Sequence, residues 1–113
     1  KMGVNLSRGE RIKYYSSDRI TQLIGNGLLT FIHKDTMYNN FFSEREIIFY
    51  SSLLDLSEKI QKYARDDFDR KKIAKKGKNK YMKYFNSTVV ADYIISNTFN
   101  FKYKKDKFMW SSK

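Results

Sequence analysis

Short apolar runs and helically spaced apolar positions divide the chain into predicted strands and helices. Apolar runs at 2–6, 28–32 and 46–50 predict three strands, and the continuous run at 28–32 is typical of a strand buried on both faces of a parallel sheet. Polar loops at 7–15 and 33–45 follow the first two strands. The pattern therefore indicates a small sheet with long loops at the ends of its strands.

Helical spacing accounts for most of the remaining chain. Capping side chains at 16–18 precede a short helix that stops at the glycines of 25–27, and a capping-box spacing precedes a helix at 53–65. A basic helix at 70–83 and a last helix after Asn86 complete the order. The apolar face expected for the basic helix consists of Phe68, Ile73, Ala74, Gly77, Tyr81 and Phe85.

The order strand, helix, strand, strand, helix, helix, helix predicts an α/β fold. Parallel strands joined by crossovers would form a partial Rossmann-like, three-layer domain with a small, mainly parallel sheet and C-terminal helices. A chain of 113 residues is long enough for one such domain. We assign residues 1–99 to it and treat 100–113 as a basic aromatic tail, whose rings are expected to pack on protein rather than on bases.

Composition excludes several kinds of chemistry. The chain has no cysteine and one histidine, so neither a disulfide framework nor a zinc cluster is expected, and we predict no metal and no cofactor. No apolar run approaches the roughly 20 residues of a membrane span, which favours a cytoplasmic protein with a peripheral place at a membrane as a further expectation. The chain starts without methionine and lacks proline, so we interpret it as a piece of a longer chain.

Positive charge is concentrated in the second half of the chain. Residues 1–56 carry a net charge of +1, whereas residues 57–113 carry +10. Such a field favours anionic partners, and an anionic membrane surface contacted through Lys71–Lys83 is a candidate, with nucleic acid less favoured. The alternative is a solvated helix face. The lysines expected on the exposed side of this helix are Lys71, Lys72, Lys75, Lys76, Lys78 and Lys80.

Candidate phosphate ligands surround the first predicted helix. Ligands of open α/β sheets bind beyond the carboxyl ends of the strands, where helix N-termini present unpaired N–H groups. Basic side chains precede this helix, and the backbone N–H groups of its first residues could bind a diphosphate; a solvated basic loop is the alternative. The candidates are Arg8, Arg11, Lys13, Ser16, Ser17, Asp18 and Arg19, and His33 at the end of the second strand is a further one.

A family resemblance covers roughly two thirds of the chain, from Ser16 to Asn86. The run SSDRITQLIGNGLLTFIHK is followed by EIIFYSSLLDLSEKIQKYARDDFDRKKIAKKGKNKYMKYFN, and together they resemble the C-terminal part of "group 1" glycosyltransferases of the GT-B fold. The most specific match is Arg-x-x-Ile-Ala-x-x-Gly, formed here by Arg70, Ile73, Ala74 and Gly77.

The resemblance implies a donor-binding half-domain, while a separate N-terminal Rossmann domain would bind the acceptor. It places Arg19 at a family arginine and Gln22 where a glutamate typically contacts the nucleotide ribose. An amide still donates and accepts hydrogen bonds, but it lacks the carboxylate charge. Tyr14 stands where the family has another acid, so both acids are replaced in this chain.

The leading functional hypothesis is therefore a glycosyltransferase segment. It would bind a nucleotide-sugar donor for transfer to a glycan or lipid acceptor, of the surface-polysaccharide type, and would not turn over as this fragment alone. The alternative is a small basic nucleic-acid-binding or scaffold module without catalysis. The aromatic residues at 28–50 lie in buried-strand patterns, which favours the first hypothesis over stacking on bases.

Overall fold

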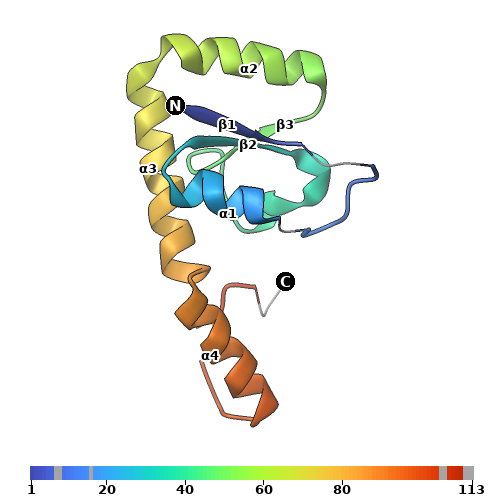
Figure 1. Cartoon of the computed structure of the whole chain (residues 1–113), viewed down its shortest axis with the longest axis vertical. Helices are drawn as coiled ribbons and strands as arrows, with labels where there is room; N and C mark the ends of the chain where they lie inside the picture. Colours follow the sequence, from blue (N-terminus) through green and yellow to red (C-terminus); the bar gives the residue numbers. More distant parts are fainter. Residues whose placement is uncertain (7–8, 16, 105–106, 111–113) are drawn as a thin grey trace.

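The computed structural model describes the chain except for residues 7–8, 16, 105–106 and 111–113 (Figure 1). Its elements confirm the predicted order of strands and helices and show that the loop at 33–45 contains two 3-10 turns. In chain order they are β1 (Met2–Asn5), α1 (Asp18–Gly25), β2 (Leu29–His33), the turns Lys34–Thr36 and Tyr38–Asn40, β3 (Ile48–Tyr50), α2 (Leu53–Arg65), α3 (Asp67–Tyr84) and α4 (Ser87–Thr98).

The three strands form one parallel sheet in the order β1, β2, β3. Met2 of β1 pairs with Leu29 of β2, and Phe31 of β2 pairs with Ile48 of β3. Parallel strands place their carboxyl ends at the same edge of a sheet. This edge is formed by Asn5, His33 and Tyr50.

Helices cover both faces of the sheet, as Figure 1 shows for α1 and α2. Successive side chains of a strand point to opposite faces, so Ile32 packs with Ile20 and Ile24 of α1, whereas Phe31 packs with Leu56 of α2. All five residues of β2 are buried. The result is the predicted three-layer, partial Rossmann-like arrangement, with its two core clusters on either side of β2.

Helix α3 runs along the side of the sheet and contacts both clusters. Ala74 packs in the α2 cluster, while Tyr81 and Phe85 pack against the α1 cluster. Between these contacts the backbone of α3 approaches the loop before β3 so closely that a Cβ at Gly77 would collide with the backbone oxygen of Glu46. The matched motif at 70–77 therefore has a packing role in this fold.

Two expectations for α3 are wrong. Phe68 is exposed, because it precedes Ile73 and Ala74, the residues of α3 that pack in the α2 cluster. Its ring lies next to the Lys72 ammonium. Lys80 is only partly exposed, because its ammonium lies 2.9 Å from a carboxylate oxygen of Glu46.

The chain beyond α3 extends away from the sheet (Figure 1). Here α4 packs against the returning tail: the ring of Tyr93 lies 5.0 Å from that of Phe108, and Trp110 lies 5.2 Å from Phe85 at the end of α3. Of the tail rings, Phe108 and Trp110 therefore pack on protein, as expected, whereas Phe101 is exposed. We call β1 to α3 the body, and α4 with residues 99–104 and 107–110 the arm.

Candidate functional site

A cavity of about 330 Å³ lies where β1 ends and α1 begins. The end of β1, the loop before α1, the first turn of α1 and the first 3-10 turn all contribute to its walls. Its lining residues are Asn5, Leu6, Glu10, Arg11, Ile12, Tyr15, Ser17, Arg19 and Thr36. The structure thus brings together three of the predicted phosphate ligands, Arg11, Ser17 and Arg19, at the carboxyl edge of the sheet.

The first turn of α1 is not capped by its N-cap side chain. Ser17 occupies the N-cap position, yet its hydroxyl donates to Oδ1 of Asn5 at 3.2 Å instead of accepting from the helix. The first N–H groups of any α-helix lack intrahelical acceptors. In α1 the Ile20 N–H donates to the backbone oxygen of Ser17 at 3.0 Å. The N–H groups before Ile20, and the positive end of the helix dipole, lie beside the cavity without a cap from the Ser17 side chain.

Asn5 accepts the hydrogen bond of the Ser17 hydroxyl. It is 7 % exposed at the end of β1, and its backbone oxygen accepts a 3.3 Å hydrogen bond from the Tyr50 hydroxyl. Burial raises the pKa of Tyr50, although the nearby Arg11 guanidinium lowers it in part, so Tyr50 remains a hydroxyl donor at neutral pH. Hydrogen bonds thus link the ends of β3 and β1 to the start of α1.

Two guanidinium groups supply positive charge to the cavity. Arg19 donates from Nη1 to the backbone oxygen of Leu6 at 2.8 Å, which holds its side chain against the end of β1. Arg11 lies 3.7 Å from a carboxylate oxygen of Asp35, and both side chains are about half exposed. Arg11 is therefore loosely paired, whereas Arg19 is fixed by a shorter bond and keeps further N–H donors for a ligand.

The other predicted ligands do not line this cavity. Lys13 places its ammonium 4.8 Å from the ring centre of Tyr14, and Asp18 and Gln22 are exposed side chains of α1 outside the cavity lining. Arg8 and Ser16 lie outside the described residues. Among the residues that the structure describes, no three metal-ligating side chains form a cluster.

His33 is held by hydrogen bonds at both ring nitrogens. Nδ1 accepts from the backbone N–H of Asp35 at 3.2 Å, so Nε2 carries the hydrogen and donates to the backbone oxygen of Ser51 at 3.0 Å. The residue is 4 % exposed. The arrangement joins the first 3-10 turn to the start of α2, which gives His33 a structural role at the carboxyl edge.

Tyr14 anchors the loop that carries Arg11. Its backbone N–H donates to the oxygen of Thr36 at 2.9 Å, its hydroxyl accepts from Asn40, and its ring lies 5.0 Å from that of Phe41. The residue at the position of a family acid is therefore a packing residue in this chain.

Sequence reasoning missed Asn5, Tyr50 and Thr36. Asn5 carried a usable signal, because it is a polar residue at the end of an apolar run, where ligands of α/β sheets bind. Tyr50 and Thr36 carried none. Tyr50 does not line the cavity but bonds to Asn5, which depends on the pairing of β2 with β3, and Thr36 reaches the cavity through the turn after β2.

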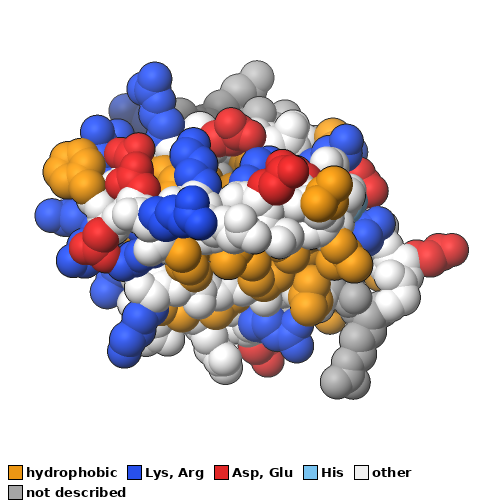
Figure 2. All heavy atoms as spheres, turned by 90° about the horizontal axis from the view of Figure 1, so that it is seen from above, with side chains coloured by type: hydrophobic (Ala, Val, Ile, Leu, Met, Phe, Trp, Pro, Cys, Tyr) orange, Lys and Arg blue, Asp and Glu red, His pale blue; other side chains and the backbone are white. Residues whose placement is uncertain are grey.

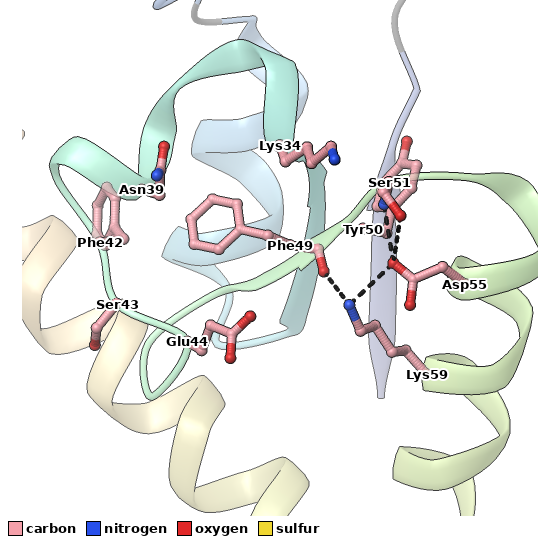
Figure 3. A pocket seen from close by; sticks show the side chains of 10 residues that line it. All are labelled: Lys34, Asn39, Phe42, Ser43, Glu44, Phe49, Tyr50, Ser51, Asp55 and Lys59. Carbon is pink, nitrogen blue, oxygen red and sulfur yellow. Dashed lines mark hydrogen bonds and ion pairs between the residues drawn. The ribbon is translucent and has the colours of Figure 1, made fainter.

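A second cavity, of about 530 Å³, lies at the outer edge of β3 (Figure 3). Lys59 of α2 reaches across this edge and donates to the backbone oxygen of Phe49 at 2.6 Å and to Asp55 at 3.0 Å. The Lys59 bond and the Ser51 N–H hold the pKa of the Asp55 carboxyl below its usual value. These polar groups satisfy one another, so we assign the site to the smaller cavity, where helix donors and Arg19 face a possible ligand.

Basic side chains form a separate surface along α3. In Figure 2, Lys and Arg side chains gather at the left of the view, the side on which α3 lies in Figure 1, with acidic and hydrophobic side chains between them. On α3 itself, Lys72, Lys75 and Lys76 are exposed. None of the helices in the described part of the chain is long and apolar enough to cross a membrane.

The sequence profile of a family described as glycosyl transferase-like matches residues 1–96. The match includes the complete sheet, the cavity at the end of β1 and most of α4. No curated protein and no solved structure matches the chain.

Proposed function

The chain belongs to the glycosyl transferase-like family, and on that premise we propose that it is the donor-binding part of a glycosyltransferase. The cavity between β1 and α1 would hold the diphosphate of a nucleotide sugar. The observation that carries this proposal is the start of α1 beside Arg19. The Ser17 hydroxyl bonds to Asn5 and does not cap the helix, so the N–H groups before Ile20 and the Arg19 guanidinium lie at the same cavity.

The proposed chemistry is electrostatic. Transfer of the sugar leaves a nucleoside diphosphate, on which negative charge develops as the glycosidic bond breaks. Fixed N–H groups and guanidinium side chains stabilise that charge without needing to reorganise. Glu10 at the cavity wall opposes an anion, so we assign the tightest contact to the α1 side of the cavity, where Arg19 lies.

The remaining parts of the proposal concern partners. The acceptor, a glycan or a lipid, would be bound by a separate N-terminal Rossmann domain, as in the GT-B arrangement. We further propose that the reaction is of the surface-polysaccharide type and that Lys71–Lys83 contact an anionic membrane surface. A nucleic-acid-binding or scaffold role is less favoured, because Trp110 and Phe108 pack inside the arm and the exposed rings of Phe99 and Phe101 stack on each other.

Titration of the chain with UDP and with GDP, followed by backbone amide NMR shifts, tests the proposed site. We expect shifts at 5–6 and 11–22. Replacing Arg19 by Gln removes a charge-assisted contact and should weaken binding about tenfold or more. Lys75→Gln is the matched control, because it removes an exposed cation on α3, and it should leave the affinity nearly unchanged.

Two outcomes would contradict this site. Shifts confined to 70–83 would mean that the nucleotide meets only the general basic field of α3. Equal weakening by Arg19→Gln and Lys75→Gln would lead to the same conclusion, since net charge alone would then explain the affinity.

A further inference from the structure

The outward face of α4 has an unusual composition for a surface helix. The helix contains one charged residue, Asp92, and this side chain lies on the covered side, 2.6 Å from the Lys107 ammonium. Exposed surface helices normally carry charged side chains on their outer face. The outer face of α4 and the turn after it instead expose Val90, Ile94, Ile95, Phe99 and Phe101.

The covered side of the same helix is already occupied. Tyr93 packs against Phe108 and Trp110, and Ser96 is buried. Beyond the helix, the rings of Phe99 and Phe101 stack on each other at 5.9 Å and remain exposed. The apolar outer face is therefore not turned toward the tail, and no described residue of the body covers it.

Exposed lysines precede and follow this uncharged face along the chain. Exposed lysines recur along α3 up to Lys83, and Lys102 and Lys104 follow the exposed rings. Between residues 70 and 104, Asp92 is the one acidic residue, and it is paired. Exposed apolar side chains can enter the boundary between headgroups and acyl chains, and lysines near them along the chain attract anionic lipids.

We propose that the outer face of α4 docks the protein on an anionic phospholipid surface. Ile94 and Ile95 enter the boundary between headgroups and acyl chains, with the Phe99–Phe101 pair beside them, and the lysines contact lipid phosphates. Aliphatic side chains favour lipid over nucleic acid, because they cannot stack on bases. The contact lies on the arm, whereas the nucleotide cavity lies at the end of β1, so docking leaves that cavity accessible.

This inference sharpens the proposed membrane setting of the enzyme and is testable without any nucleotide. The 113-residue chain is co-sedimented with vesicles of phosphatidylcholine alone and of phosphatidylcholine mixed with phosphatidylglycerol. We expect binding to the anionic vesicles, and we expect it to weaken as salt shortens the Debye length from about 10 Å at 0.1 M to about 3 Å at 1 M.

A matched pair of double variants tests whether vesicle binding depends on the α4 face or on exposed apolar side chains anywhere in the chain. Ile94→Ser with Ile95→Ser should lower the partition coefficient at least about tenfold, because two inserted aliphatic side chains are lost. Leu53→Ser with Leu54→Ser changes two residues that are more exposed, 77 % and 71 % against 58 % and 48 %, but lie on α2, and should have no effect. Lys102→Gln should weaken binding about fivefold at low salt.

Folding and nucleotide binding are monitored in the same variants. Trp110, which packs on Phe85 and Phe108, reports by its fluorescence that the arm remains folded. UDP affinity should be equal in both double variants, so a failure of docking is distinguishable from a failure of the nucleotide site. The proposal is overturned if the α4 variant binds vesicles as the unmodified chain does, or if both double variants lose binding equally. Oligonucleotide binding that persists at high salt and displaces vesicles, or a dimer that the α4 variant abolishes, would also overturn it.

Discussion

The body and the arm are both stabilised by aromatic contacts and by an ion pair, but these contacts are more deeply buried in the body than in the arm. In the body, the Lys80–Glu46 pair is partly buried, and the rings pack against a sheet that other elements cover on both faces. In the arm, the Lys107–Asp92 pair is about half exposed, and the rings of Phe108 and Trp110 cover one side of α4.

This difference teaches that two consecutive segments of the second half of the chain have different structural roles. The part of α3 from Ile73 to Tyr81 is a layer of the body, held close by Gly77. The chain beyond Phe85 is held by its own tail, which also contacts the α1 cluster through Met109 and Trp110, and it leaves an apolar face outward. The body is thus suited to hold a preorganised cavity, and the arm is suited to make an external contact.

The largest expected effect comes from removing one ring in each region. Phe31 of β2 and Phe108 of the tail are both fully buried. Phe31→Ala should lower the free energy of unfolding of the whole chain by about 3–5 kcal/mol. Phe108→Ala should instead expose the arm amides to hydrogen exchange while the strands keep their protection. Equal loss of strand protection in both variants would show that body and arm unfold as one unit.

Gly77→Ala tests how closely α3 must approach the body. Alanine favours the helix by about 1 kcal/mol, but its Cβ would collide with the backbone oxygen of Glu46, which cannot rotate away as a side chain can. Overpacking of this kind costs up to about 3 kcal/mol, so we expect a net loss of about 2 kcal/mol in urea unfolding. Gly25→Ala is the control, since no atom lies within 4 Å of its added Cβ, and it should be neutral or stabilising.

Asn5→Ala tests whether the body, and not the arm, preorganises the proposed nucleotide site. Without Asn5 the Ser17 hydroxyl should turn to cap α1 and compete for its N–H groups, a bond of about 1 kcal/mol. UDP should then bind about fivefold more weakly in an NMR titration. Adding Ser17→Ala should restore most of the affinity, whereas Phe108→Ala should not change it. No recovery in the double variant would mean that Asn5 acts directly on the ligand or only on folding.

The smallest effect concerns the ion pair that fixes α3 to the loop before β3. Partial burial raises the pKa of Glu46, but the Ser43 N–H and the Lys80 ammonium outweigh it, so the folded pKa lies below the ordinary value of 4.5. The ion pair therefore stabilises the fold above that value, and its contribution is lost as the pH falls through the folded pKa. Lys80→Gln should cost about 0.2–1 kcal/mol at pH 7.

Urea unfolding at several pH values from 7 to about 3 checks this prediction. The difference between the unmodified chain and Lys80→Gln should shrink as the pH falls below the ordinary value for Glu46. Lys75→Gln, which removes an exposed lysine, should show no such trend. A difference that stays constant with pH would mean that Lys80 acts through the packing of its alkyl chain.

The sequence by itself determined the elements and the class of fold. The continuous apolar run before His33 predicts a strand buried on both faces, and Ser52 caps α2 through the N–H of Asp55 as its spacing predicts. These features depend on residues a few positions apart, whose geometry the local backbone fixes. Phe68 was misassigned because helical spacing defines a face but does not say where along its length a helix meets the sheet.

The site, in contrast, was decided by the tertiary structure. Local chemistry placed Ser17 correctly at the start of α1, but the acceptor of its hydroxyl lies twelve residues away on β1, and Tyr50, which bonds to Asn5, lies on β3. The candidates Lys13 and Gln22 have suitable chemistry near the same helix, yet they do not line the cavity. Side-chain direction depends on which elements pack together, so contacts between distant parts of the chain, rather than residue type, select the members of this site.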